Sequence, residues 1–379
     1  MSKKRQTGLA ALGMILGLMS VDSVADDDLL VFVSAFAKGD AGAIHAFRVD
    51  SKRGTMQPVH RTTEVENPFF LALSPNRKFL YSIHTPDFSD EVNDGIAAFR
   101  LEGNSGRMTL LNQQSALGTT SCYLDVDRTG RTLVVANYSS GSVASLPIRK
   151  DGSLGKAASF IQHSGSSVNS QRQSGPHAHC FVISPDNRYV LSADLGLDQV
   201  LSYRLDSRDA KLSIPRQPFV RTPAGAGPRH LTFHPNGRWI YVIHELSNAV
   251  SVLDYNDKTG VMIERQTIST LPKEFSGTSH CADVKVTPDG RFVYGTNRGH
   301  DSIAIYRVLD GGLLKTVAIV PSLGKGPQNL AVTPDGRLLL CANMPGGNVA
   351  VFRIDRKRGS LTPVGEPIKV PSPSCIMIR

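Results

Sequence analysis

"GPRHLTFHPNGRWIYVIHELSNAV", from Gly227 to Val250, places a tight turn between two apolar-rich runs. Asn236-Gly237 between such runs is the strongest short indication of a β-hairpin, because both residues accept the backbone angles of the turn. The strand ends away from the turn carry four ionisable side chains: Arg229, His230, His244 and Glu245. The stretch therefore predicts a hairpin with a polar end opposite its turn.

The same pattern recurs along the chain. "SPNRKFLYSIH" begins at Ser74, "DRTGRTLVVANY" at Asp127, "SPDNRYVLSADL" at Ser184, "TPDGRFVYGTNR" at Thr287 and "TPDGRLLLCANM" at Thr333. The turn arginines, Arg77, Arg131, Arg188, Arg238, Arg291 and Arg337, are 54, 57, 50, 53 and 46 residues apart. A period of about 50 residues with strand character predicts a propeller or a solenoid.

Each repeat holds enough strand-forming sequence for one propeller blade. In the opening unit "LTFHP" leads into the turn, "WIYVIH" leaves it, "AVSVLDY" follows, and a weaker fourth strand comes after a glycine-containing loop. Four short antiparallel strands make a blade. Six full units leave three strands at the N-terminus and one, "SCIMIR", at the C-terminus. We therefore predict an all-β fold: a seven-bladed β-propeller of four-stranded antiparallel blades, closed by pairing of the N- and C-terminal strands.

The first 25 residues have the features of a secretory signal peptide. A basic start at Lys3, Lys4 and Arg5 precedes the apolar run "GLAALGMILGLM", and Ser23-Val24-Ala25 fits the small-residue cleavage rule. The alternative is an uncut N-terminal anchor. We expect cleavage after Ala25, a single propeller domain over residues 26–379, and a periplasmic or secreted protein with no membrane association after signal removal.

Charge and cysteine content indicate which partners and which cysteine state to expect. The net charge of +9 comes from scattered basic residues, without the clustered footprint that nucleic-acid binding requires, so we expect no nucleic-acid partner. A general preference for anionic ligands is the better interpretation. The five cysteines form no Cys-x-x-Cys motif. They are expected to be small buried side chains, although an exported protein could form disulfides.

Hairpin pairing predicts which residues share an end of each blade. Around each tight turn, paired positions have a nearly constant index sum, which places Arg229 opposite His244, His179 opposite Asp194 and Cys281 opposite Asn297. First strands line a propeller's channel in parallel, so these groups should converge at one mouth. The alternatives are hydrated channel residues, or a structural ion pair between Arg229 and Glu245.

The stretches "GAGPRHLTFHPNGRWIYVIHELSNAVSVLDY", "ADVKVTPDGRFVYGTNRGHDSIAIYRV" and "SPDNR" resemble the seven-bladed lactonase family. This family includes propeller-type 6-phosphogluconolactonases and carboxy-cis,cis-muconate cyclases, and the resemblance covers essentially the whole mature chain. It implies a catalytic site of His179, with His177 as a near alternative, together with Arg229, Glu245 and Arg298. These are the residues that hairpin geometry had already brought to one mouth.

Other histidines near these positions are predicted to contact substrate: His177, His230, His244 and His300. His244 replaces the asparagine usual in the family, and His280 and Cys281 are also unusual. With His177, His179 and Cys180 these residues could suggest a metal site, but they lack compact ligand spacing, so we expect no metal and no cofactor.

The resemblance implies lactone hydrolysis on a small anionic or lactone substrate. Arg229 and Arg298 suit stabilisation of the oxyanion or capture of a substrate anion, and either Glu245 or His179 could be the general base. A phosphorylated sugar lactone belongs to the cytoplasm, so a plain sugar lactone or another acidic lactone is an equal expectation. Two alternatives stay open: lactonisation of a muconate-type diacid, and a non-enzymatic propeller that binds a ligand or a protein.

Overall fold

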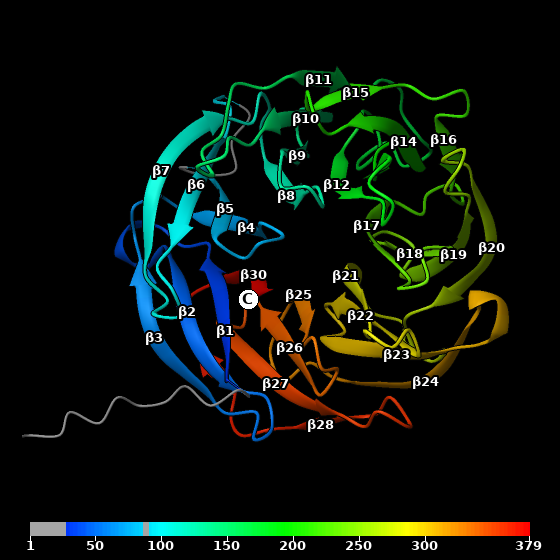
Figure 1. Cartoon of the computed structure of the whole chain (residues 1–379). Coiled ribbons are helices and arrows are strands. Elements are labelled where there is room, and N and C mark those ends of the chain that lie inside the picture. The colour runs from blue at the N-terminus through cyan, green and yellow to red at the C-terminus, as the bar shows by residue number, and fades with distance from the viewer. Residues whose placement is uncertain (1–27, 86–90) are drawn as a thin grey trace, which may run out of the picture.

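The computed structural model describes residues 28–85 and 91–379. They form seven antiparallel sheets around a central axis, as the blades of a propeller (Figure 1). The helices within these ranges are two short 3₁₀ segments, Gly39–Ala41 and Asp310–Gly312, and none of the helices there is long and apolar enough to cross a membrane. The predicted seven-bladed all-β propeller is confirmed. The predicted signal peptide, residues 1–25, lies outside the described residues.

The strands run outward from the axis in sequence order within each of the first six blades. The first three blades contain β4 (Pro68–Leu73), β5 (Phe79–His84), β6 (Gly95–Leu101) and β7 (Met108–Ser115); β8 (Ser121–Val126), β9 (Thr132–Asn137), β10 (Ser142–Pro147) and β11 (Ser159–Gln162); and β12 (Ala178–Ile183), β13 (Tyr189–Asp194), β14 (Gln199–Asp206), β15 (Lys211–Ser213) and β16 (Phe219–Arg221). In the third blade β15 and β16 both pair with β14, so the outermost strand is divided in two.

The next three blades repeat this plan. They contain β17 (Pro228–Phe233), β18 (Trp239–His244), β19 (Ala249–Tyr255) and β20 (Met262–Ser269); β21 (His280–Val286), β22 (Phe292–Arg298), β23 (Ser302–Val308) and β24 (Leu314–Pro321); and β25 (Pro327–Val332), β26 (Leu338–Asn343), β27 (Asn348–Ile354), β28 (Leu361–Pro363) and β29 (Ile368–Lys369). The outermost strand of the sixth blade is also divided, into β28 and β29.

The seventh blade is shared between the two ends of the chain, as predicted. Its order is β3 (Met56–Thr62), β2 (Ala43–Asp50), β1 (Asp28–Ala35) and β30 (Pro373–Ile378), with the C-terminal strand innermost. Val31 pairs with Ile378 and Ser34 with Cys375 across the closing contact. This pairing closes the ring, so the innermost strands of all seven blades surround the axis (Figure 1).

Three of the six repeated arginines, Arg188, Arg291 and Arg337, pair with an aspartate of their own hairpin turn. In the third blade the Ser184 hydroxyl donates to Asp186 Oδ1, and Arg188 Nε donates to the other oxygen of Asp186 at 2.7 Å. Thr287, Asp289 and Arg291 make the same contacts in the fifth blade. In these three blades the arginine therefore stabilises its turn, at the end of the blade opposite the polar mouth.

Three buried tyrosines of the second strands join neighbouring blades in the same way. Each donates its hydroxyl to a glycine carbonyl in the outer loop of the next blade, where the glycine has a positive φ that favours glycine over other residues. The pairs are Tyr81 to Gly152, Tyr241 to Gly312 and Tyr294 to Gly359. Each pair satisfies a buried hydroxyl and fixes the angle between two blades.

Gly312→Ala should destabilise the protein more than Gly311→Ala does. Both glycines have left-handed φ angles, 81° and 77°, so alanine costs about 1–2 kcal/mol at either position. At Gly312 an added Cβ would also lie 2.3 Å from the ring of Trp239, whereas at Gly311 it meets open space. Denaturant unfolding of the two variants measures the difference. Equal losses of unfolding free energy would show that Trp239 moves aside without cost.

Candidate active site

The innermost strand of every blade has a β-bulge near its first residue. A bulge inserts an extra residue and re-aims its side chain. The extra residues are Phe69 and Phe70 in β4, Cys122 in β8, His179 in β12, Arg229 in β17, Ala282 and Asp283 in β21, Gln328 in β25 and Ser374 in β30. Two of the candidate residues at the channel mouth, the end of the innermost strands away from the hairpin turns, therefore come from bulged positions: His179 and Arg229.

The bulges correct two of the predicted pairs. Pro228, not Arg229, lies opposite His244, and Ala178, not His179, lies opposite Asp194. The constant index sum fails there because each bulge adds one unpaired residue to the inner strand. Cys281 does lie opposite Asn297, as predicted.

Glu245 is the centre of the charged groups at this mouth. Its Oε2 accepts hydrogen bonds from Arg229 Nε at 2.9 Å and from Arg298 Nη2 at 2.8 Å. Its Oε1 accepts from Arg172 Nη2 at 2.7 Å. The Nε2 atom of His179 lies 3.9 Å from Oε2. The structure thus brings together all four predicted catalytic residues and adds Arg172. These five residues are called the Glu245 cluster below.

The cluster is buried on one side and open on the other. The side chains of Arg229, Glu245 and His179 are 3%, 7% and 9% exposed, whereas those of Arg298 and Arg172 are 27% and 35% exposed. Three guanidinium groups face one carboxylate, which leaves an excess of positive charge. A ligand that enters from solvent meets Arg172 and Arg298 first, and the buried groups lie behind them.

Burial and charge decide the protonation states. Burial alone would raise the pKa of Glu245, but Arg298 and Arg229 outweigh it and hold that pKa well below its usual range. Burial, helped by the charge of Arg229, lowers the pKa of His179 well below 6.5. Glu245 is therefore an ionised carboxylate and His179 a neutral imidazole at neutral pH.

An aromatic wall borders the cluster. Tyr138 stacks on His177 with ring centroids 4.5 Å apart, and its ring meets the edge of His179 at 5.0 Å. The Tyr138 hydroxyl accepts a hydrogen bond from Arg172 Nη2. His177 also donates its Nδ1 hydrogen to the Tyr138 carbonyl at 3.0 Å. The partly exposed His177 therefore lies beside the cluster, where contact with a ligand is open to it.

His230 lies behind Arg229. It is 3% exposed, its Nε2 is 3.1 Å from Arg229 Nη1, and its Nδ1 is 2.9 Å from Asp283 Oδ1. Burial first, and then Arg229, lower the pKa of His230 to about 4. The ring that fits both partners is neutral, with its proton on Nδ1. Both ring nitrogens are thus already engaged by the protein.

Two predicted substrate-contacting histidines lie apart from the Glu245 cluster. His244 is fully buried within its own blade, where its Nε2 lies 2.7 Å from Ser251 Oγ. His300 Nδ1 contacts Ser302 Oγ at 2.6 Å, and its ring packs against Phe275. Neither makes a hydrogen bond or an ion pair with the cluster in the part of the chain that the structure describes.

The cysteines are buried and unpaired. All five are free thiols, and Cys122 Sγ lies 3.5 Å from His179 Nδ1. Within residues 28–85 and 91–379, no three His, Cys, Asp or Glu side chains are grouped as metal ligands. Cys122 therefore serves as a small neighbour on the far side of the His179 ring.

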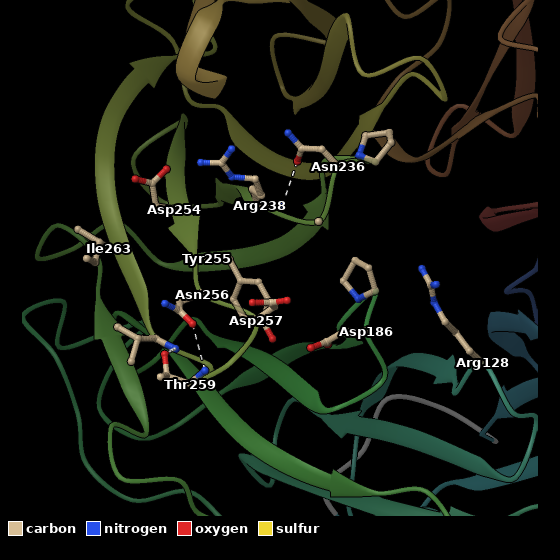
Figure 2. A pocket seen from close by; sticks show the side chains of 14 residues that line it. Arg128, Asp186, Asn236, Arg238, Asp254, Tyr255, Asn256, Asp257, Thr259 and Ile263 are labelled. Carbon is tan, nitrogen blue, oxygen red and sulfur yellow. Dashed lines mark hydrogen bonds between the residues drawn. The ribbon is translucent and has the colours of Figure 1, made fainter.

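A groove of about 850 Å³ lies at the opposite end of the blades, between hairpin turns of the third and fourth blades (Figure 2). Arg128, Asp186, Arg238 and Asp254 are among its lining residues. Asp186 is paired with Arg188, which braces its own turn. The charged lining residues named above are exposed or half-buried, whereas Arg229, Glu245 and His179 at the channel mouth are buried.

The sequence did not predict Arg172, a member of the Glu245 cluster, or two residues beside the cluster, Tyr138 and Gln328. Arg172 lies in the loop between β11 and β12, Tyr138 follows β9, and Gln328 accepts from Arg298 Nη1 at 3.4 Å. The sequence indicates only the loop that holds Arg172. The interval of 57 residues between Arg131 and Arg188 is the longest between turn arginines, so this repeat contains extra residues.

Comparison with known proteins identifies the family. The family described as "Lactonase, 7-bladed beta-propeller" matches residues 30–378, so the chain belongs to the seven-bladed β-propeller lactonase family. Members of this family named as lactonases are carboxylic ester hydrolases.

Individual relatives cover almost the whole chain. A 6-phosphogluconolactonase of Bacillus subtilis is 35% identical over 91% of this chain and 97% of its own length. A 6-phosphogluconolactonase of Formosa agariphila is 30% identical over 80% of this chain and 86% of its own. The structure of the periplasmic gluconolactonase PpgL of Pseudomonas aeruginosa superposes with a TM-score of 0.87, at 31% identity, over 93% of this chain and 99% of that one.

Proposed function

We propose that the protein hydrolyses a sugar lactone to its hydroxy acid at the Glu245 cluster. One observation carries the proposal: the neutral imidazole of His179 lies beside buried cationic donors, with its Nε2 3.9 Å from the Glu245 carboxylate. Ester hydrolysis needs a proton acceptor for the attacking water and positive donors for the oxyanion that forms. Both requirements meet at this point of the channel mouth.

In the proposed reaction His179 Nε2 takes a proton from water while the water oxygen bonds to the lactone carbonyl carbon. The carbonyl electron pair moves onto its oxygen, which Arg229 stabilises. Nη2 of Arg229 is the donor available, because its Nε and Nη1 bond to the protein and Nη2 has no partner among the described residues. Collapse of the oxyanion breaks the ring C–O bond, and the ring oxygen takes the proton from His179.

Glu245 acts as an anchor in this scheme, not as the base. A carboxylate whose pKa is held far below neutrality by three guanidinium groups is a weak proton acceptor. It orients Arg172, Arg229 and Arg298, and its negative charge offsets the cost of forming a buried imidazolium at His179. The sequence left Glu245 and His179 as equal candidates for the base, and the charge distribution favours His179.

The substrate is proposed to be an unphosphorylated sugar lactone or another acidic lactone, met outside the cytoplasm. The signal-peptide pattern of residues 1–25 and the similarity to a periplasmic gluconolactonase support this location. N-terminal sequencing of the exported protein should begin at Asp26. Full-length protein confined to the cytoplasm would contradict export and would favour 6-phosphogluconolactone as the substrate.

A lactone panel tests the function directly. Purified residues 26–379 are assayed by acid release at constant pH with δ-gluconolactone, its 6-phosphate and a muconolactone, and spontaneous hydrolysis is subtracted. Catalysed release from a sugar lactone supports the proposal. Absence of turnover on every lactone would favour a ligand-binding propeller instead.

As the pH is lowered, kcat/KM should begin to fall only well below pH 6.5. Burial and the charge of Arg229 lower the pKa of His179, so the ring stays unprotonated, and able to accept a proton, at pH values where an ordinary histidine is charged. Because the pKa is depressed, activity should persist as the pH falls through 6.5 and be lost only below it. A pH profile corrected for spontaneous hydrolysis measures this, and half-loss at or above pH 6.5 would contradict it.

A further inference from the structure

A hydrogen-bonded chain of buried side chains runs from the closing strand to Arg229. Three inner strands of neighbouring blades, β25, β21 and β17, each contribute to it. Its contacts are Ile376 N to Asn329 Oδ1 at 2.8 Å, Asn329 Nδ2 to Asp283 Oδ2 at 2.9 Å, His230 Nδ1 to Asp283 Oδ1 at 2.9 Å, and Arg229 Nη1 to His230 Nε2 at 3.1 Å. The chain therefore ends on a guanidinium group of the Glu245 cluster.

The chain fixes the direction of each donor. Asp283 is fully buried and ionised: burial alone would raise its pKa, but Lys285 and the bond to His230 hold that pKa well below its usual range. An ionised carboxylate only accepts, so His230 must donate from Nδ1, which leaves Nε2 as an acceptor for Arg229. Asn329, Lys285 and the backbone N–H groups of Val284 and Leu330 also donate to this carboxylate. The tautomer of His230 thus follows from Asp283.

Arg229 is held on two of its three nitrogens. Nε donates to Glu245, while Nη1 donates both to His230 and to the Ala282 carbonyl at 2.6 Å. With these contacts in place the guanidinium plane cannot rotate, so the position of the remaining nitrogen, Nη2, is also set. His230 supplies the only side-chain acceptor for Nη1 among the described residues.

Direct contact of His230 with a ligand is not available in this arrangement. Its side chain is enclosed by the rings of Phe70, Tyr123 and His179, whose centroids lie 6.1, 5.1 and 5.5 Å from its own. Both of its nitrogens are occupied, and it is 3% exposed. The sequence-based prediction that His230 binds substrate is therefore replaced by an indirect role.

We propose that His230 is a positioning residue: held by Asp283, it fixes the Arg229 guanidinium so that Nη2 faces the reacting carbonyl oxygen. The inference rests on the proposed function, because it assigns Arg229 to the oxyanion. A misplacement of about 1 Å at a reacting group can lower the rate about 10²-fold, so a residue that touches no substrate can still control kcat.

Two substitutions at one position separate positioning from chemistry. The amide of His230→Gln can donate to Asp283 and accept from Arg229, but it does not titrate. His230→Leu fills a similar volume and can do neither. We expect the glutamine variant to retain most of the parent activity with an unchanged pH profile, and the leucine variant to lose about 10²-fold in kcat with a smaller change in KM.

Two matched asparagine variants test the hydrogen-bonded chain at Asn329, one residue beyond Asp283. Asn329→Leu removes the amide that bonds Asp283, whereas Asn343→Leu removes another buried amide of the same blade, bonded to the Ser322 carbonyl and Asn348. Both variants should lose stability, because each loses buried hydrogen bonds. Only Asn329→Leu should lower kcat beyond what its folded fraction explains.

Crystal structures of the two His230 variants provide a readout that needs no substrate. Arg229 should keep its parent position in His230→Gln and leave it in His230→Leu. The proposal is overturned if the glutamine variant fails as badly as the leucine variant while Arg229 stays in place, or if His230→Leu leaves both Arg229 and kcat unchanged. A parent that hydrolyses no lactone would refute the proposed function alone, and the position of Arg229 would still decide this inference.

Discussion

Arg229→Ala should remove nearly all lactone turnover while the propeller stays folded. Loss of a positioned donor to an oxyanion lowers the rate about 10²–10³-fold. Glu245 remains paired with Arg172 and Arg298 in this variant, so no unpaired buried carboxylate is created. Glu245→Gln should have a comparable effect, because it weakens the anchor for all three guanidinium groups and removes the charge that stabilises a protonated His179.

The matched control for Arg229→Ala is Arg238→Ala. Arg238 belongs to the same hairpin, but it is exposed and lies at the turn end, in the groove of Figure 2. We expect parental kcat and KM from this control, and parental circular dichroism from all three variants. Full activity in folded Arg229→Ala and Glu245→Gln would show that the reaction occurs elsewhere.

Deletion of Pro373–Arg379 should cause the largest loss of stability. These residues contain β30, the innermost strand of the shared blade, in which Cys375 and Ile376 are 1% and 4% exposed. Removal of each large buried side chain costs about 2–5 kcal/mol, and the inner edge of β1 is also left without its partner. The truncated protein should melt far below the parent or fail to fold.

A shorter deletion provides the comparison for this truncation. Removal of residues 377–379 leaves the four buried residues Pro373 to Ile376 in place, and takes away partly exposed side chains together with two of the five pairs with β1. Thermal unfolding should therefore show a smaller loss for the short deletion than for the long deletion. An unchanged melting temperature after the long deletion would mean that β30 does not hold the ring closed.

The blade plan could be predicted because turn chemistry and strand patterns are local. Asn236-Gly237 marks one hairpin, the repeated arginines mark six, and apolar-rich runs mark the strands around them. The shared seventh blade could also be predicted, because the three N-terminal strands and one C-terminal strand left over from the six repeats add up to one blade. Each of these features depends on residues close together in the chain.

The details of the site could not be predicted because they depend on contacts between blades. The bulges at His179 and Arg229 break the register that the hairpin rule assumes, and no turn residue signals them. Arg172 comes from a loop without strand periodicity. His244 and His230 sit at the expected strand ends, yet their side chains are directed into the protein, toward Ser251 and Asp283.

The most direct test of the account is the structure of residues 26–379 with the δ-lactam analogue of gluconolactone, which keeps the carbonyl but resists hydrolysis. The account predicts that the lactam binds at the channel mouth, with its carbonyl oxygen within hydrogen-bond distance of Arg229 Nη2 and its carbonyl carbon facing His179 Nε2. A lactam bound in the groove between the hairpin turns, with the Glu245 cluster unoccupied, would contradict the central claim.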